Sequence, residues 1–189
     1  MASAACRSVL LALLFVSGAV VAKQPVVKPS ADRANLPMRK AGLWEVTIQG
    51  HAAPGARGVR QSAQTVLQCT DAKAERVMLL SILPTQENCG AFNVASSKKG
   101  SYDIAGACKV HDQRVVLNMQ LRGDLNAMYG GTYSAEYPGA AMAKVGPVGF
   151  QGRWLGACKP GQRPGDMVLP NGAKVNVVDD VERAEGHAH

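Results

Sequence analysis

Residues Cys89–Lys109 read CGAFNVASSKKGSYDIAGACK, and this stretch predicts a β-hairpin. Two segments in which apolar and polar residues alternate, Phe92–Ser96 and Ser101–Lys109, flank the turn sequence Lys98-Lys99-Gly100. Glycine at the last position of that turn suits the left-handed backbone that closes a three-residue hairpin loop. The hairpin therefore supplies two antiparallel strands beside which further strands can be added.

The apolar residues of this hairpin fix its register. When they share one face, the opposed pairs are Ser97–Ser101, Val94–Ile104 and Phe92–Gly106. Cys108 then faces Gly90 rather than Cys89, a mismatch of one residue. A β-bulge at Gly90 would absorb the mismatch, because glycine adopts the unusual backbone angles that a bulge requires. The hypothesis is a Cys89–Cys108 disulfide across the open end of the hairpin.

The N-terminus predicts export. Residues 1–22 match a secretory signal peptide, with a lone Arg7 before the apolar run Ser8–Ala22 and small residues at its end. The run has 15 residues, fewer than the ~20 that a bilayer-crossing helix needs, so we prefer cleavage to an uncleaved anchor. Cleavage after Ala22 removes Cys6 and lowers the formal net charge from +7 to +6.

Four cysteines then remain, namely Cys69, Cys89, Cys108 and Cys158. An even number in an exported chain predicts two structural disulfides. None of the four has a C-x-x-C or C-x-x-C-H neighbour, so redox, zinc-finger and haem-attachment sites lack support. Given Cys89–Cys108, the second pair by elimination is Cys69–Cys158, which closes a loop of roughly 90 residues.

The exported chain is expected to contain a leader, one β-domain and an extension. Residues 23–40 hold three prolines and no periodicity, which favours a flexible leader. Within residues 41–159, the predicted disulfide-stapled β-domain, alternation is clearest over Val115–Arg122. The other expected strands cover residues 43–49, 64–69, 130–137 and 148–158, and a helix capped by Thr70 or Asp71 covers residues 72–80.

The extension, residues 160–189, contains a turn sequence, Leu169-Pro170-Asn171-Gly172, between two short apolar segments. It predicts a small hairpin of residues 167–169 and 174–178, followed by a frayed end from Glu182. Many short strands and one short helix predict a mainly β fold. The preferred architecture is an antiparallel meander forming a curved sheet or small barrel, with the helix against one end.

Five sequence elements occur in a distinctive order: Gly42-Leu43-Trp44-Glu45-Val46-Thr47, then Gln64–Thr70, the Cys89/Cys108 pair, Gly131-Thr132-Tyr133, and Gly156-Ala157-Cys158-Lys159. Together they resemble the domain of unknown function 3617 family of small exported proteobacterial proteins, over about residues 41–159. The resemblance implies a signal peptide, a periplasmic location and no established activity or catalytic residues. The chain departs from the family where Ala157 replaces the usual Asp before the last cysteine, and in its long extension.

The sequence offers few candidates for catalysis. There is no G-x-S-x-G motif, and the histidines of the expected domain, His51 and His111, fall in predicted turns. His111-Asp112 could serve as a base with its orienting carboxylate, but solvated turn residues are the preferred interpretation. A carboxylate pair for glycoside hydrolysis would come from Glu45, Asp103, Asp124 and Glu136, which are expected to face solvent.

A metal site or a nucleic-acid partner is also not predicted. The tail residues Glu182, Glu185, His187 and His189 could bind a divalent cation loosely, but an unfolded acidic end is preferred. The methionines form no M-x-x-M cluster, and Met119 is expected in the core. Lys and Arg are scattered, with doublets only at Arg39-Lys40 and Lys98-Lys99, and aromatic residues are few.

These patterns predict an exported periplasmic, non-enzymatic binding domain without cofactor and without stable membrane insertion after signal cleavage. Its apolar strand faces could line a cavity for a small amphipathic ligand, or the domain could bind an envelope protein. The alternative is an envelope accessory or inhibitor protein that acts through surface loops, with His51–Arg60 and Ala140–Gly149 as candidates. An undescribed hydrolase is the minor alternative.

Overall fold

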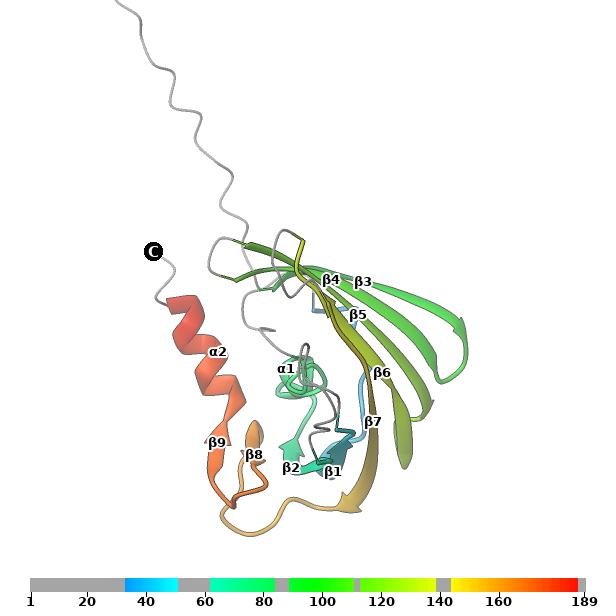
Figure 1. Ribbon diagram of the computed structural model, residues 1–189. Coiled ribbons are helices and arrows are strands. Elements are labelled where there is room, and N and C mark those ends of the chain that lie inside the picture. Colours follow the sequence, from blue (N-terminus) through cyan, green and yellow to red (C-terminus); the bar gives the residue numbers. More distant parts are fainter. Residues whose placement is uncertain (1–32, 51–61, 84–88, 111–112, 139–143, 187–189) are drawn as a thin grey trace, which may run out of the picture.

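A computed structural model describes residues 33–50, 62–83, 89–110, 113–138 and 144–186 (Figure 1). The strands are β1 (Gly42–Ile48), β2 (Gln64–Thr70), β3 (Cys89–Lys98), β4 (Ser101–Val110), β5 (Gln113–Asp124), β6 (Met128–Glu136), β7 (Lys144–Gly156), β8 (Asp166–Val168) and β9 (Lys174–Asn176). The helices are α1 (Glu75–Met78) and α2 (Val177–Gly186). The mainly β fold is therefore confirmed.

All nine strands belong to one antiparallel sheet, in the order β3-β4-β5-β6-β7-β1-β2-β8-β9. The sheet curves around the side on which α1 lies (Figure 1). Among the described residues, its end strands β3 and β9 do not pair with each other, so the sheet is open. The curved sheet is thus confirmed and the small barrel is wrong, because a barrel has no end strands.

The apolar phases of the strands meet on the concave face and form the main core. Along β5 the buried side chains are Val115, Leu117, Met119 and Leu121, as alternation predicts. They belong to one cluster with Trp44, Val46, Tyr129 and Phe150 from neighbouring strands. Leu36, Leu79, Leu80 and Leu83 join the same cluster, so segments outside the sheet cover its concave face.

The register of the β3–β4 hairpin is the predicted one in its middle but not at its turn. There it shifts after Ser96, so that Lys98 rather than Ser97 lies opposite Ser101, and the loop has two residues instead of three. Val94 lies opposite Ile104, and the register shifts between Phe92 and Cys89, so that Cys89 lies opposite Cys108. The shift confirms the expected irregularity next to Gly90. Both predicted disulfides form, with Cα–Cα distances of 3.8 Å for Cys89–Cys108 and 5.4 Å for Cys69–Cys158.

The leader does not extend to Lys40. Leu36 and Arg39 are buried, and the backbone N–H of Lys40 donates to the carbonyl oxygen of Leu125 at 2.8 Å. The prediction of a flexible leader is therefore wrong for residues 33–40, because the Arg39 charge finds buried partners inside the domain. Residues 23–32 and the predicted signal peptide lie outside the described residues.

Two predictions about helices also need correction. The first helix is α1 alone rather than residues 72–80, and its N-cap is Ala74 rather than Thr70 or Asp71, without a side-chain cap hydrogen bond. Asp71 instead accepts the N–H groups of Lys73 and Ala74 in the turn before the helix. Residues 182–186 are not frayed, because they continue α2. Val177 and Val181 of α2 are buried, and Val177 packs in a small cluster with Ala74 and Met78.

Candidate functional site

The four carboxylates considered for catalysis do not converge. Glu45 pairs with Arg153, Asp103 with Arg122, and Glu136 with Lys144, each at 2.9 Å on the exposed side of the sheet. Asp124 lies in the β5–β6 turn, where the backbone N–H and side-chain amide of Asn126 donate to it and lower its pKa. Each carboxylate therefore has its own local partner.

Several other candidates lie outside the described residues: His51, His111, Asp112, His187, His189 and the loop His51–Arg60. Of the loop Ala140–Gly149, residues 144–149 are not a loop, because they form the start of β7. In the described ranges, no group of three or more His, Cys, Asp or Glu residues could hold a metal ion. None of the described helices is long and apolar enough to cross a membrane.

Sequence reasoning missed a buried polar network centred on Arg39. Its guanidinium forms a two-bond ion pair with Glu75, and both side chains are fully buried. The Nη1 group donates to Gln68 Oε1 at 2.8 Å and to the Tyr129 hydroxyl at 2.7 Å. The rings of Trp44 and Tyr129 flank the guanidinium, with centroids 5.4 and 5.5 Å away.

The surroundings raise the pKa of both Arg39 and Tyr129. Burial alone would lower the pKa of Arg39, but the interactions of its guanidinium with Tyr129 and Glu75 outweigh burial and raise that pKa. Burial raises the pKa of Tyr129, so its hydroxyl stays protonated. Because the network is enclosed and its hydrogen bonds are satisfied, it joins the N-terminal segment, β2, α1 and β6 rather than contacting a ligand.

The network left one signal in the sequence. Gln68 shares the buried phase of β2 with Val66, and a polar residue in an apolar phase indicates a buried hydrogen-bond partner. Arg39 carried no comparable signal, because it precedes the first strand in a segment without periodicity.

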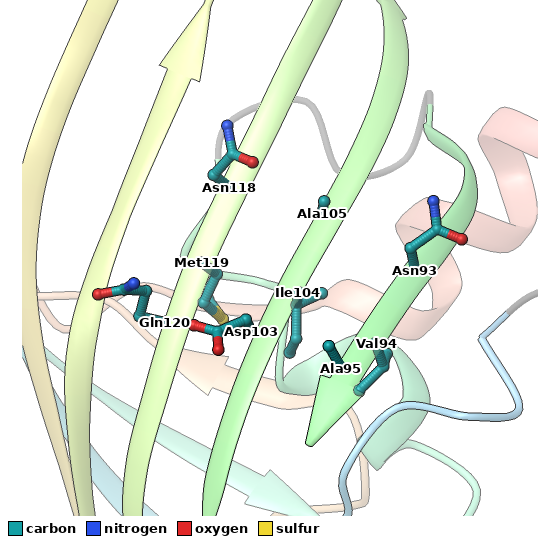
Figure 2. A pocket seen from close by; sticks show the side chains of 9 residues that line it. All are labelled: Asn93, Val94, Ala95, Asp103, Ile104, Ala105, Asn118, Met119 and Gln120. Atoms are coloured by element: carbon teal, nitrogen blue, oxygen red, sulfur yellow. The ribbon is translucent and has the colours of Figure 1, made fainter. Parts of the chain in front are cut away.

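The described surface has an open depression of about 420 Å³ over three strands (Figure 2). It is lined by Asn93, Val94, Ala95, Asp103, Ile104, Ala105, Asn118, Met119 and Gln120. We call it the β3–β5 depression. Strand pairing aligns its outer-face residues in two rows, Asn93–Ala105–Asn118 and Ala95–Asp103–Gln120. Val94, Ile104 and Met119 alternate with these rows and point to the opposite face.

The accessible lining of the β3–β5 depression is mainly apolar, and three amide side chains are among its lining residues. Ala95 and Ala105 have small side chains, so the surface is hollowed between their larger neighbours. The side-chain amides of Asn93, Asn118 and Gln120 make no hydrogen bond to other described residues, so their donors and acceptors are available. The carboxylate of Asp103 is already paired with Arg122, at 2.9 Å. The lining contains no histidine, cysteine or serine, and thus no nucleophile with an adjacent base.

The structure defines a class of protein: an open antiparallel β-sheet protein with two disulfides, an enclosed ion-pair network and a neutral surface depression. The family model described as "Protein of unknown function (DUF3617)" matches residues 39–158. The chain belongs to this family, which confirms the resemblance. No match to the chain is found among curated proteins or solved structures.

The matched region runs from Arg39 of the buried network to Cys158 of the longer disulfide. It contains seven strands, β1 to β7, and the whole β3–β5 depression. The elements β8, β9 and α2 follow it. The extension is therefore an addition to the family domain, and the candidate site belongs to the domain itself.

Proposed function

We propose that the protein is an exported periplasmic, non-enzymatic domain that binds an envelope protein through the β3–β5 depression. Export is supported by the predicted signal peptide together with two disulfides, which persist in oxidising compartments. The observation that carries the binding role is the set of three amide side chains, Asn93, Asn118 and Gln120, which have no hydrogen-bond partner among the described residues and surround the small side chains of Ala95 and Ala105.

The geometry favours a protein over a small amphipathic ligand. Sites for small molecules bury most of the ligand in a concave, mainly apolar pocket. Here the apolar concave face is packed against Leu36 and Leu79, whereas the β3–β5 depression is open and spans three strands. Amide side chains on an open strand surface can exchange hydrogen bonds with the peptide groups of a partner.

A non-enzymatic role is supported by the separation of the titratable groups. The carboxylates of β1, β4 and β6 each pair with a different exposed cation. Two carboxylates are buried in the described structure. Glu75 is enclosed with Arg39, and Asp166 accepts the side-chain amide of Asn176 and pairs with Lys174. Hydrolytic chemistry needs a nucleophile or water held against an accessible base, and no such pair occurs among the residues lining the β3–β5 depression.

Site-specific photo-cross-linking in the periplasm tests the proposal. Benzoylphenylalanine at Asn118 should give a protein adduct, whereas the same group at Gln151, an exposed amide on β7, should give none. Adding Ala105→Arg, which fills the β3–β5 depression, should abolish the Asn118 adduct. Equal adducts at both positions, an adduct only with a small molecule, or no adduct at Asn118 would overturn the proposed protein partner.

Fractionation tests the export part separately. The chain should appear in the osmotic-shock fraction with a mass that begins at Lys23 and is four hydrogens below the fully reduced value. Recovery of the full-length chain from the cytosol, or free thiols in the exported chain, would contradict export into an oxidising compartment.

A further inference from the structure

The outer edge of β3 is an open hydrogen-bonding surface. Within the described part of the chain, β3 pairs with one strand only, β4. A strand at the end of a sheet presents a row of backbone N–H and C=O groups that can pair with another strand. Over Phe92–Ser96 the pairing with β4 is regular, so the outer edge is regular there too.

The composition of β3 does not oppose pairing. Edge strands are usually protected by charged residues, proline, short length or β-bulges. The register of β3 against β4 shifts on each side of Phe92–Ser96, so only this middle segment is available for regular pairing. The strand has ten residues, and residues 90–97 include neither a charge nor a proline. The side chains of Asn93, Ala95 and Ser96 are exposed, so they would not have to leave a core to accept a neighbour.

Charge at one end of β3 selects the orientation of an identical neighbour. Lys98 ends the strand and Lys99 follows it. Parallel pairing of two copies would place their Lys98 residues about 5 Å apart, whereas antiparallel pairing about Val94 separates them by about 25 Å, beyond the screening length. The same strand is therefore compatible with its own copy in the antiparallel orientation.

We infer that β3 pairs antiparallel with β3 of a second copy, which gives a two-fold symmetric dimer with one continuous sheet. Two-fold self-pairing is the commonest symmetry of homo-oligomers and requires only one self-complementary surface. The short regular segment Phe92–Ser96 makes the interface small, so dimerisation should depend on concentration. This inference does not depend on the proposed protein partner.

The dimer would complete the β3–β5 depression. Asn93 and Ala95 lie on the edge strand itself, so the β3–β5 depression is bounded by β4 and β5 on one side only. A second β3 would place its own Asn93 and Ala95 beside them on the same face. The two depressions would then form one continuous surface across the two-fold axis.

Single-cysteine cross-linking tests the dimer sharply. Opposed residues of an antiparallel pair point to the same face, so the two-fold axis must pass between two copies of one residue. In the series N93C, V94C, A95C and S96C, the residue on the axis meets its copy at a Cα distance of about 5 Å. Its neighbours are about 8 Å from their own copies, which is too far for a disulfide.

The expected result is one strongly cross-linked variant in the series, with native disulfides intact by peptide mapping and no cross-link in the matched control Gln151→Cys. Ala95→Lys, at an exposed position, should weaken dimerisation at least tenfold by sedimentation without changing the circular dichroism spectrum. A monomer at the highest attainable concentration, equal cross-linking along the series, or a dimer unaffected by Ala95→Lys would overturn the inference. A mixed complex at β3 in place of the dimer would also overturn it.

Discussion

The two ends of the sheet are built differently. The last strand, β9, has three residues and continues directly into α2. Around it, Asp166 accepts the side-chain amide of Asn176, and Arg163 pairs with Asp179. At the other end, β3 has ten residues, and no described strand lies beyond it. We call the first the closed end, because its end strand is short and runs into a helix, and the second the open end, because its long end strand carries a charge only at Lys98.

The closed end comes from the extension. Strand β8 pairs with β2 at Leu67 and Gln68, so β2 would be an edge strand without it. Helix α2 places Val177 against Ala74 and Met78 of the α1 region. The family match ends before these elements. The comparison therefore locates the added structure at one end of the sheet and leaves β3, within the family domain, as the edge strand at the other end.

Removing the disulfides should cause the largest losses of stability, and these losses should differ between the two ends. Cys69–Cys158 closes 89 residues and Cys89–Cys108 only 19. The chain-entropy relation gives about 4.5 and about 3 kcal/mol of stabilisation respectively. Paired Cys→Ala variants measured by urea denaturation should therefore differ by roughly 1 kcal/mol or more. A larger loss of stability on removing Cys89–Cys108, at the open end, would contradict the prediction that the disulfide closing the longer loop stabilises the protein more.

Two matched carboxylate-to-amide substitutions should lower the stability of the protein by clearly different amounts. Glu75→Gln breaks a fully buried pair and leaves Arg39 uncompensated, so it should cost about 3–4 kcal/mol. Asp103→Asn removes an exposed pair at the open end and should cost less than about 1 kcal/mol. Chemical denaturation of both variants measures the contrast. Similar costs would mean that the Arg39 network does not hold the domain together.

Glycine-to-alanine substitutions test how readily the Arg39 network and the β3 end of the sheet make room for an added methyl group. A Cβ at Gly152 would lie 2.2 Å from the Tyr129 ring, which is fixed by its bond to Arg39. A Cβ at Gly106 would lie 2.5 Å from the ring of Phe92 on the edge strand. Overpacking costs roughly 1–3 kcal/mol, and we expect Gly152→Ala at the upper end and Gly106→Ala at the lower. Thermal unfolding tests this order, and the reverse order would show that the β3 end is the more rigid one.

The smallest effect should be an acid sensitivity of the closed end. Burial alone would raise the pKa of Asp166, but hydrogen bonds from Arg163 N–H and Asn176, with Lys174 nearby, lower it. Its carboxylate therefore contributes stability above its unfolded pKa of about 3.9, and this contribution is lost as pH falls through the folded pKa. The stability difference between the native protein and Asp166→Asn should shrink below pH about 4. A stability difference that is constant with pH would show that the Asp166 carboxylate does not cause the acid sensitivity.

Much of this fold could be predicted from the sequence because the strands and the hairpin depend on residues that are close together in the chain. Alternation placed Val94 opposite Ile104, and a glycine beside Cys89 accounted for the register shift that brings the cysteines together. The Arg39 network was not predictable in the same way, since its partner Glu75 is 36 residues away and on a different element. The α2 helix was missed because its apolar side is defined by the surface that it contacts.

The candidate site was only half predictable. Alternation places Asn118 and Gln120 on the outward phase of their strand. It does not show that Asn93 and Ala105 align with Asn118 across two neighbouring strands, which depends on the register of the whole meander. The exposed edge of β3 follows only from the order of strands in the sheet.

Hydrogen exchange of the exported protein tests most directly whether one end is open and the other closed. Backbone amides of Phe92–Ser96 should alternate between slow exchange, where they face β4, and fast exchange at the outer edge in dilute protein. The fast set should become protected as protein concentration rises, while amides of the β8–β9 hairpin should keep the same protection throughout. Outer-edge amides of β3 that are protected at every concentration, or a β8–β9 hairpin that exchanges faster than β3, would contradict the account.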